Sequence, residues 1–179
     1  MRINTPATLL ATGLWLYSGG AALQAAPSSG KVHPMTKRFM TKAAQDSMAE
    51  VELGKLAQEK GQGAEVKNYG QKLVSDHTKA NDELKALASD KGVTLPTSLG
   101  AEHKATKARL EKLSGAAFDR AFRDVMVADH QKAVALFRKQ AHSGKDRDVK
   151  AWAAKTLPTL EEHLKMARDI SQPAHRASR

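Results

Sequence analysis

Four long segments of the chain carry apolar side chains at alternating spacings of three and four residues, and this periodicity constrains the fold more than any other feature. The segments are residues 35–60, 64–91, 116–142 and 146–170. Such spacings bring side chains onto one face of an α-helix, so each segment is predicted to form an amphipathic helix. The pattern therefore predicts an all-α protein whose helices bury their apolar stripes against one another.

Glycine and proline residues separate these segments into pairs. Gly61 follows the first segment and Gly144 follows the third, and only a short turn precedes the next segment in each case. Gly92 ends the second segment, and Pro96 prevents it from resuming because proline cannot continue a helix. Pro158 lies inside the fourth segment and is expected to bend it. The chain is therefore predicted to contain two helical hairpins.

The two predicted hairpins are related to each other in sequence. A shift of 83 positions aligns Phe39 with Phe122 and Gly61 with Gly144. The same shift aligns the start of the second helix, residues 66–72, with the start of the fourth. We interpret this similarity as an internal duplication, because both the core residues and the turn are retained.

Residues 92–115 connect the two hairpins. Within them, residues 99–113 are predicted to form a short helix with Ser98 as its N-cap. Main helices of about 26 residues extend over about 39 Å, and the connection is long enough to run back along them. Short turns within hairpins and one long crossover between them predict a ferritin-like four-helix bundle with a short extra helix. The alternative is a plain up-down bundle in which residues 99–113 form a fifth helix.

The first 25 residues are predicted to be a secretory signal peptide. Arg2 is the only charge among the first 30 residues, and an apolar stretch at 9–23 is followed by small residues, an order typical of signal peptides. The stretch is too short and too interrupted for a stable membrane span, although an uncleaved anchor is the alternative. We therefore expect a periplasmic or otherwise exported protein. The predicted organisation is signal peptide 1–25, flexible leader 26–34, bundle 35–171 and polar tail 172–179.

The composition narrows the classes of partner. The net charge of +10 is spread over the polar faces of the helices, and the chain has four Phe, two Tyr and two Trp. This is unlike a base-stacking surface, so we expect a solvated basic surface and no nucleic acid. The lack of cysteine excludes disulfides and thiolate metal sites. No segment of the mature chain is expected to span a membrane, and the absence of an exposed heptad seam predicts a monomer.

Several stretches of the chain resemble the DUF4142 family. They are residues 43–45, 49–57 and 66–67, the Asp-His pairs at 76–77 and 129–130, residues 113–115 with 118–120, and residues 155–158 with 163–164. The resemblance extends over about residues 36–170. It implies a ferritin-like bundle in an exported bacterial protein, and it leaves the activity open because the family has no assigned function.

Three of the seven histidines lie on the apolar stripes of different predicted helices. They are His77, His130 and His163, and Glu50 occupies the stripe of the remaining main helix. Counting residues outward from the turn places Ser47 level with His77, and the shift of 83 positions aligns Ser47 with His130. Because Glu50 and His163 are each about one turn from this level, all four side chains are expected near a common centre. The other histidines are expected to be exposed: His33, His103, His142 and His175.

This set of side chains is suited to a transition-metal ion. Imidazole ligands suit Zn²⁺, Fe²⁺, Cu²⁺ and Ni²⁺. A di-iron site is not expected, because the Glu-x-x-His motif of di-iron bundles is absent and Val74, Val127 and Leu160 occupy the positions three before the histidines. The predicted ligands are Glu50, His77, His130 and His163, and the predicted partners of those ligands are Asp76, Asp129 and Glu162.

Two other interpretations of the histidines stay open. Buried histidines can form a structural polar network with Glu50 and water, and clustered histidines can sense pH. The sequence has no clear catalytic motif, which favours a non-catalytic exported protein that contacts a protein or another component of the cell envelope, in maintenance or stress tolerance. The alternative function is a metal-binding protein or a metal-dependent enzyme that uses the histidine and glutamate cluster.

Overall fold

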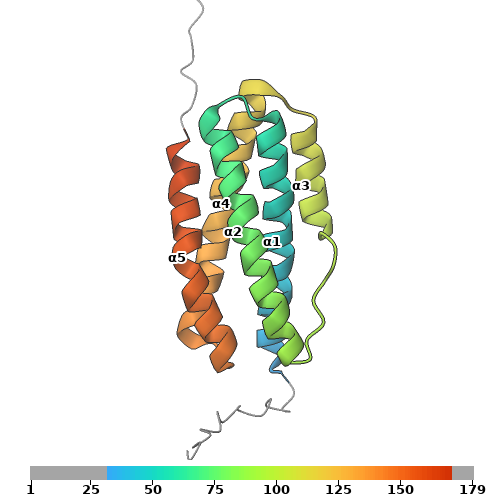
Figure 1. Cartoon of the computed structure of the whole chain (residues 1–179), viewed down its shortest axis with the longest axis vertical. Coiled ribbons are helices and arrows are strands. Elements are labelled where there is room, and N and C mark those ends of the chain that lie inside the picture. The colour runs from blue at the N-terminus through green and yellow to red at the C-terminus, as the bar shows by residue number, and fades with distance from the viewer. Residues whose placement is uncertain (1–31, 171–179) are drawn as a thin grey trace, which may run out of the picture.

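Five α-helices make up residues 32–170, the part of the chain that the computed structural model describes (Figure 1). This part contains no strand, which confirms the all-α prediction. Within it, no helix is both long and apolar enough to cross a membrane. The helices are α1 (Pro34–Lys60), α2 (Ala64–Asp90), α3 (Ala101–Glu111), α4 (Gly115–Ser143) and α5 (Arg147–Asp169).

The four long helices form two hairpins that pack side by side. Helices α1 and α2 form the first hairpin and α4 and α5 the second, while α3 lies outside the bundle against α1 (Figure 1). The crossover returns along the bundle, so α2 and α4 run in the same direction. This order agrees with the single long crossover of ferritin-like bundles. Because α3 runs opposite to both α2 and α4, the five helices also alternate in direction along the chain, so the order fits the up-down alternative with a fifth helix as well. Beyond this order of connection, the resemblance to ferritin-like proteins stays a prediction.

The helix boundaries lie close to the predicted ones. Helix α1 begins at Pro34, one residue inside the predicted leader, because proline suits the first helical position, where no intrahelical N–H bond is made. Helix α3 begins after Gly100, so the prediction of Ser98 as its cap was wrong. Helix α5 continues through Pro158. The predicted signal peptide 1–25 and tail 172–179 lie outside the described residues.

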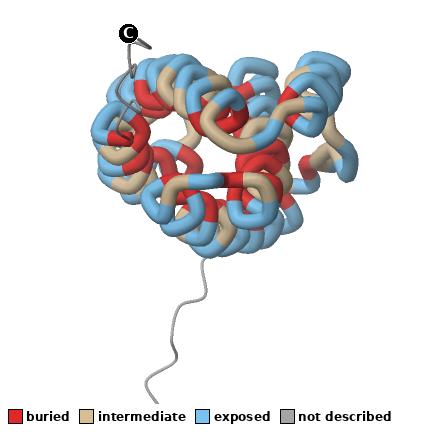
Figure 2. Tube along the Cα trace, turned by 90° about the horizontal axis from the view of Figure 1, so that it is seen from above, coloured by how far each residue is buried: buried red, intermediate tan, exposed pale blue. Residues whose placement is uncertain are grey.

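Residues on the inner sides of the helices are buried, and those on the outer sides are exposed (Figure 2). Phe39 packs edge-on against Trp152, with ring centroids 6.1 Å apart and an interplanar angle of 66°. The positions shifted by 83 form the corresponding pair, Phe122 and Tyr69, at 6.1 Å and 64°. Each pair belongs to a separate apolar cluster. The matching geometry supports the predicted duplication.

Polar contacts join the two hairpins at both ends of the bundle. The buried carboxylate of Asp119 on α4 accepts hydrogen bonds from the backbone N–H groups of Gln62 and Gly63, at 3.0 and 2.9 Å. At the other end, the ammonium group of Lys91 lies 2.8 Å from Asp146. These contacts set the hairpins in register, so side chains near the middle of each hairpin meet in one layer.

Candidate metal centre

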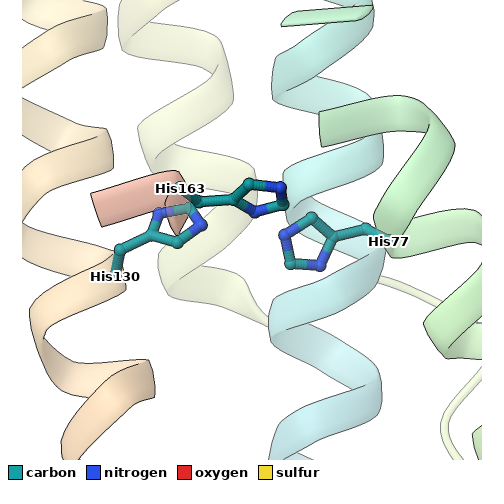
Figure 3. A group of neighbouring side chains, drawn as sticks. All are labelled: His77, His130 and His163. Carbon is teal, nitrogen blue, oxygen red and sulfur yellow. The ribbon is translucent and has the colours of Figure 1, made fainter. Parts of the chain in front are cut away.

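The three predicted histidines meet in the interior of the bundle. His77 comes from α2, His130 from α4 and His163 from α5, and their exposed fractions are 7, 1 and 0%. The ring centroids lie 5.2 to 5.9 Å apart. One potential ligand nitrogen from each ring lies within 4.8 Å of those from the other two. Figure 3 shows the imidazoles turned toward one another from separate helices.

A protein group holds the outward nitrogen of each ring. Nδ1 of His77 lies 3.1 Å from the hydroxyl of Ser47, which donates its own hydrogen to the backbone carbonyl of His77. Nδ1 of His130 lies 3.0 Å from the carbonyl oxygen of Met126. Nε2 of His163 lies 2.8 Å from a carboxylate oxygen of Asp76. In all three contacts the partner accepts, so the outward nitrogen of the histidine carries the hydrogen.

The remaining nitrogen of each neutral ring therefore carries a lone pair. These nitrogens are Nε2 of His77, Nε2 of His130 and Nδ1 of His163, and all three are buried without a hydrogen-bond partner. Buried polar atoms in proteins nearly always have a partner. A hydrogen bond to the nitrogen opposite the metal is also what orients histidine ligands in metal sites. The local arrangement is thus that of a three-histidine ligand set.

The separation of the rings is close to the requirement of a shared ion. Imidazole nitrogens bind Zn²⁺ at about 2.1 Å, so three of them around a tetrahedral ion lie about 3.4 Å from one another. Nitrogens within 4.8 Å of one another reach this geometry by a small inward movement of each ring. A tetrahedral ion would keep a fourth position for another ligand.

Burial keeps the imidazoles in the neutral form that binds metals. Loss of hydration lowers the pKa of His77 well below its ordinary value, and the neighbouring histidines lower it further. The same cause, with a contribution from His163, lowers the pKa of His130 to about 4. Burial also lowers the pKa of His163, although Asp76 opposes the change. Neutral imidazoles expose their lone pairs without competition from a proton near neutral pH.

Glu50 lies beside the three histidines and is not part of their closest set. Its side chain is buried, with 6% of the residue exposed, and one carboxyl oxygen is 3.9 Å from Nδ1 of His130. The other oxygen has no hydrogen-bond partner. Burial raises the pKa of Glu50 well above its ordinary value, and the charges of Asp129 and Asp46 raise it further. The role of Glu50 as a metal ligand stays a prediction.

The three acidic residues predicted to orient the ligands have different surroundings. Asp76 bonds to His163, as described above. Asp129 instead pairs with Lys132 at 3.8 Å, and the largely exposed Glu162 lies 3.5 Å from Lys72. Neither forms a hydrogen bond with the three histidines. Only Asp76 therefore occupies the place expected of a partner to a ligand.

The sequence did not identify every residue around the centre. The buried ring of Tyr69 lies 6.1 Å from that of His163, and its hydroxyl has no hydrogen-bond partner. The position of Tyr69 on the apolar stripe of α2 predicted only that it is a core residue. His103 was expected to be exposed, which was wrong: its ring is largely buried and lies 2.9 Å from Asp46. His33 and His142 are exposed as predicted, and His175 lies outside the described residues.

Comparison with known proteins places the chain in a family. The model of the family described as "Domain of unknown function (DUF4142)" matches residues 21–170. The chain belongs to the DUF4142 family. The match includes both hairpins, the crossover and all three histidines of this DUF4142 protein.

A solved structure shares the fold. A crystal structure of a DUF305 fragment from Deinococcus radiodurans matches with a TM-score of 0.68 and 18% identity, over 78% of this chain and 96% of the other. At this identity the likeness concerns the helical fold alone. No curated protein matches the chain.

Proposed function

We propose that this DUF4142 protein binds one divalent transition-metal ion through His77, His130 and His163. The observation that carries the proposal is the convergence of three buried ring nitrogens, each a lone-pair acceptor without a partner. Three acceptors that face one another have no hydrogen to share, so a cation is the simplest group that satisfies all of them. Zn²⁺, Fe²⁺, Cu²⁺ and Ni²⁺ are the candidate ions.

The location of this activity is part of the same proposal. A signal peptide at residues 1–25 would export the protein, and the bundle would hold the metal in the periplasm or outside the cell. We rank metal binding above a non-catalytic role in contacting an envelope partner. In the described part of the chain, Met35 is the one large hydrophobic side chain that is exposed, which gives little support to a large apolar interface.

The test is to measure metal bound by the chain without a histidine tag. The protein is stripped with a chelator, incubated with Zn²⁺, Ni²⁺, Cu²⁺, Co²⁺ or, without oxygen, Fe²⁺, then dialysed and analysed for its elements. We expect one ion per chain. Co²⁺ bound at a nearly tetrahedral site should also produce visible absorption bands, which report its coordination.

Matched variants separate the centre from surface histidines. The triple variant His77→Gln, His130→Gln, His163→Gln should lose the bound ion, whereas His142→Gln, which changes an exposed histidine, should retain it. Circular dichroism establishes that both variants are folded. Stoichiometric metal in the triple variant, or none in the parent chain, would falsify the proposal.

A further inference from the structure

A cavity of about 170 Å³ lies next to the histidine cluster. His77, His130 and Glu50 line it in the interior of the bundle. The exposed side chains of Lys42 and Lys132 also line it, so it extends from the interior toward the surface between α1 and α4. The cavity thus connects the polar layer of the bundle with its outside.

The walls of this cavity are largely apolar and partly aromatic. They include Leu84 from α2, Phe137 from α4, and Trp152 and Leu160 from α5. The rings of Phe137 and Trp152 lie 5.4 Å apart. An apolar cavity of about 150 Å³ in another protein accommodates one benzene molecule. The volume and the walls therefore suit a ligand with a single ring.

The cavity is also lined by residues whose buried polar atoms have no partner. Nε1 of Trp152 and one carboxyl oxygen of Glu50 are buried without a hydrogen bond, as are the inner nitrogens of His77 and His130. The indole N–H can only donate, and the imidazole lone pairs can only accept. A hydroxyl group both donates and accepts, so it can satisfy groups of either kind.

We propose that this cavity binds a ring-sized molecule that carries a hydroxyl group, with the ring against Phe137 and Trp152 and the hydroxyl in the Glu50 region. A carboxylate on the ring is disfavoured at the inner end of the cavity, because Asp46 and Asp129 also line the cavity and would bring like charges together, while Lys42 and Lys132 lie at its exposed end. The proposal goes beyond the metal centre and does not require a bound metal, since the protein alone forms the walls.

The test uses Trp152 as the reporter. The chain has two tryptophans, so the variant Trp15→Phe leaves Trp152 as the only one. Phenol is titrated into the metal-free full chain carrying this substitution, with excitation at a wavelength that phenol does not absorb. We expect a saturable change in emission, and calorimetry should show one site. Toluene, which has a similar ring without a hydroxyl, should bind about tenfold more weakly, the effect of one net hydrogen bond.

Variants locate the site. Ala133→Leu enlarges a side chain of the cavity wall and should abolish phenol binding. If this variant does not fold, Ala80→Val, which fills the cavity from α2, should have the same effect. Ala154→Leu, at an exposed position of α5 that does not line the cavity, is the matched control and should bind normally. Glu50→Leu should still bind toluene but lose the preference for phenol.

Three outcomes would overturn the proposal. The first is the absence of a saturable signal, which would indicate that the cavity holds only water. The second is binding that both folded cavity-filling variants retain, and the third is equal affinity for phenol and toluene. Because the titrations are metal-free and metal binding is measured by elemental analysis, the failure of either proposal can be distinguished from the failure of the other.

Discussion

The two hairpins pack alike near their ends and differ in the layer between. Each contributes one phenylalanine to an edge-on aromatic pair with the other hairpin, and the two pairs have the same centroid separation of 6.1 Å. In the middle layer, the positions aligned by the shift of 83 residues carry different side chains. Ser47 aligns with His130, Glu50 with Ala133, His77 with Leu160, and Ala80 with His163.

This difference shows which part of the duplication is retained. Apolar packing is kept in both halves, while the polar layer has one histidine from the first hairpin and two from the second. A symmetric pair of sites would need the same ligands in each half. Here neither hairpin holds the three histidines by itself, so the centre forms only when the hairpins pack together.

The largest expected effect tests the apolar packing, in which the two hairpins are alike. Phe39→Ala and Phe122→Ala each remove a buried ring, and each should lower the free energy of unfolding by about 4 kcal/mol. Urea unfolding of the two variants and the parent measures this loss. Equal losses with unchanged denaturant dependence support structural equivalence, whereas a large inequality would show that the two aromatic pairs have different energetic roles.

Acidification tests the polar middle layer, in which the two hairpins differ, because His77 titrates and its counterpart Leu160 does not. The pKa of His130 falls from about 6.5 in an unfolded chain to about 4 in the fold. The unfolded state then binds more protons between these values, so stability is fully present above pH 6.5 and decreases as the pH falls toward 4. For His130 alone the loss is about 3 kcal/mol, and the lowered pKa values of His77 and His163 add to it.

Glu50 acts in the opposite direction and provides the control. Its pKa is raised in the fold, so protonation of Glu50 favours the folded state as the pH falls. Glu50→Gln should therefore steepen the loss of stability of the metal-free protein below pH 6.5, and His130→Gln should flatten it. Urea unfolding at several pH values measures both slopes. A parent stability that does not change between pH 6.5 and 4, with the same flat profile in Glu50→Gln, contradicts the expected burial of neutral histidines.

A smaller effect concerns how closely the helices of each hairpin approach. A Cβ added at Gly70 would lie 2.6 Å from the carbonyl oxygen of Gly54 and 2.8 Å from the Cβ of Ala57. Gly70→Ala should therefore cost about 2 kcal/mol. Ala153, which aligns with Gly70, belongs to the second hairpin, and Ala153→Gly should cost about 1 kcal/mol through helix propensity. Thermal unfolding decides the sign: stabilisation by Gly70→Ala would mean that helix propensity outweighs the contact.

The fold was largely predictable from the sequence because its signals are local. Apolar periodicity and the glycines at 61, 92 and 144 placed the long helices to within about two residues. Residue counting from the turn also placed Ser47 level with His77, and the two side chains lie within hydrogen-bond distance at 3.1 Å. Such counting works because helical rise is constant.

The details of the centre were less predictable because they depend on how neighbouring helices are rotated and spaced. Glu50 lies on the predicted apolar stripe of α1, yet its carboxyl group lies beside the three histidines and is not part of their closest set of ligand atoms. The two Asp-His pairs look alike in sequence, but Asp76 reaches His163 across the hairpin interface and Asp129 pairs with Lys132. The pattern of one helix does not contain the position of its neighbour, so it could not separate these two aspartates.

The smallest expected effect uses this pair of aspartates to sharpen the comparison. Asp76→Asn keeps the shape of the side chain but weakens its hold on His163, and it should reduce metal affinity about tenfold, as loss of a partner to a histidine ligand does elsewhere. Asp129→Asn, the same change in the other Asp-His pair, should leave affinity nearly unchanged because Asp129 pairs with Lys132 and forms no hydrogen bond with a histidine of the centre. Competition with a chelator of known affinity measures both constants. If both variants bind equally well, the contact between Asp76 and His163 contributes to packing alone. If Asp129→Asn has the larger effect, the ion lies on the cavity side of the cluster near Glu50, and the ligand set must be revised to include that carboxyl group.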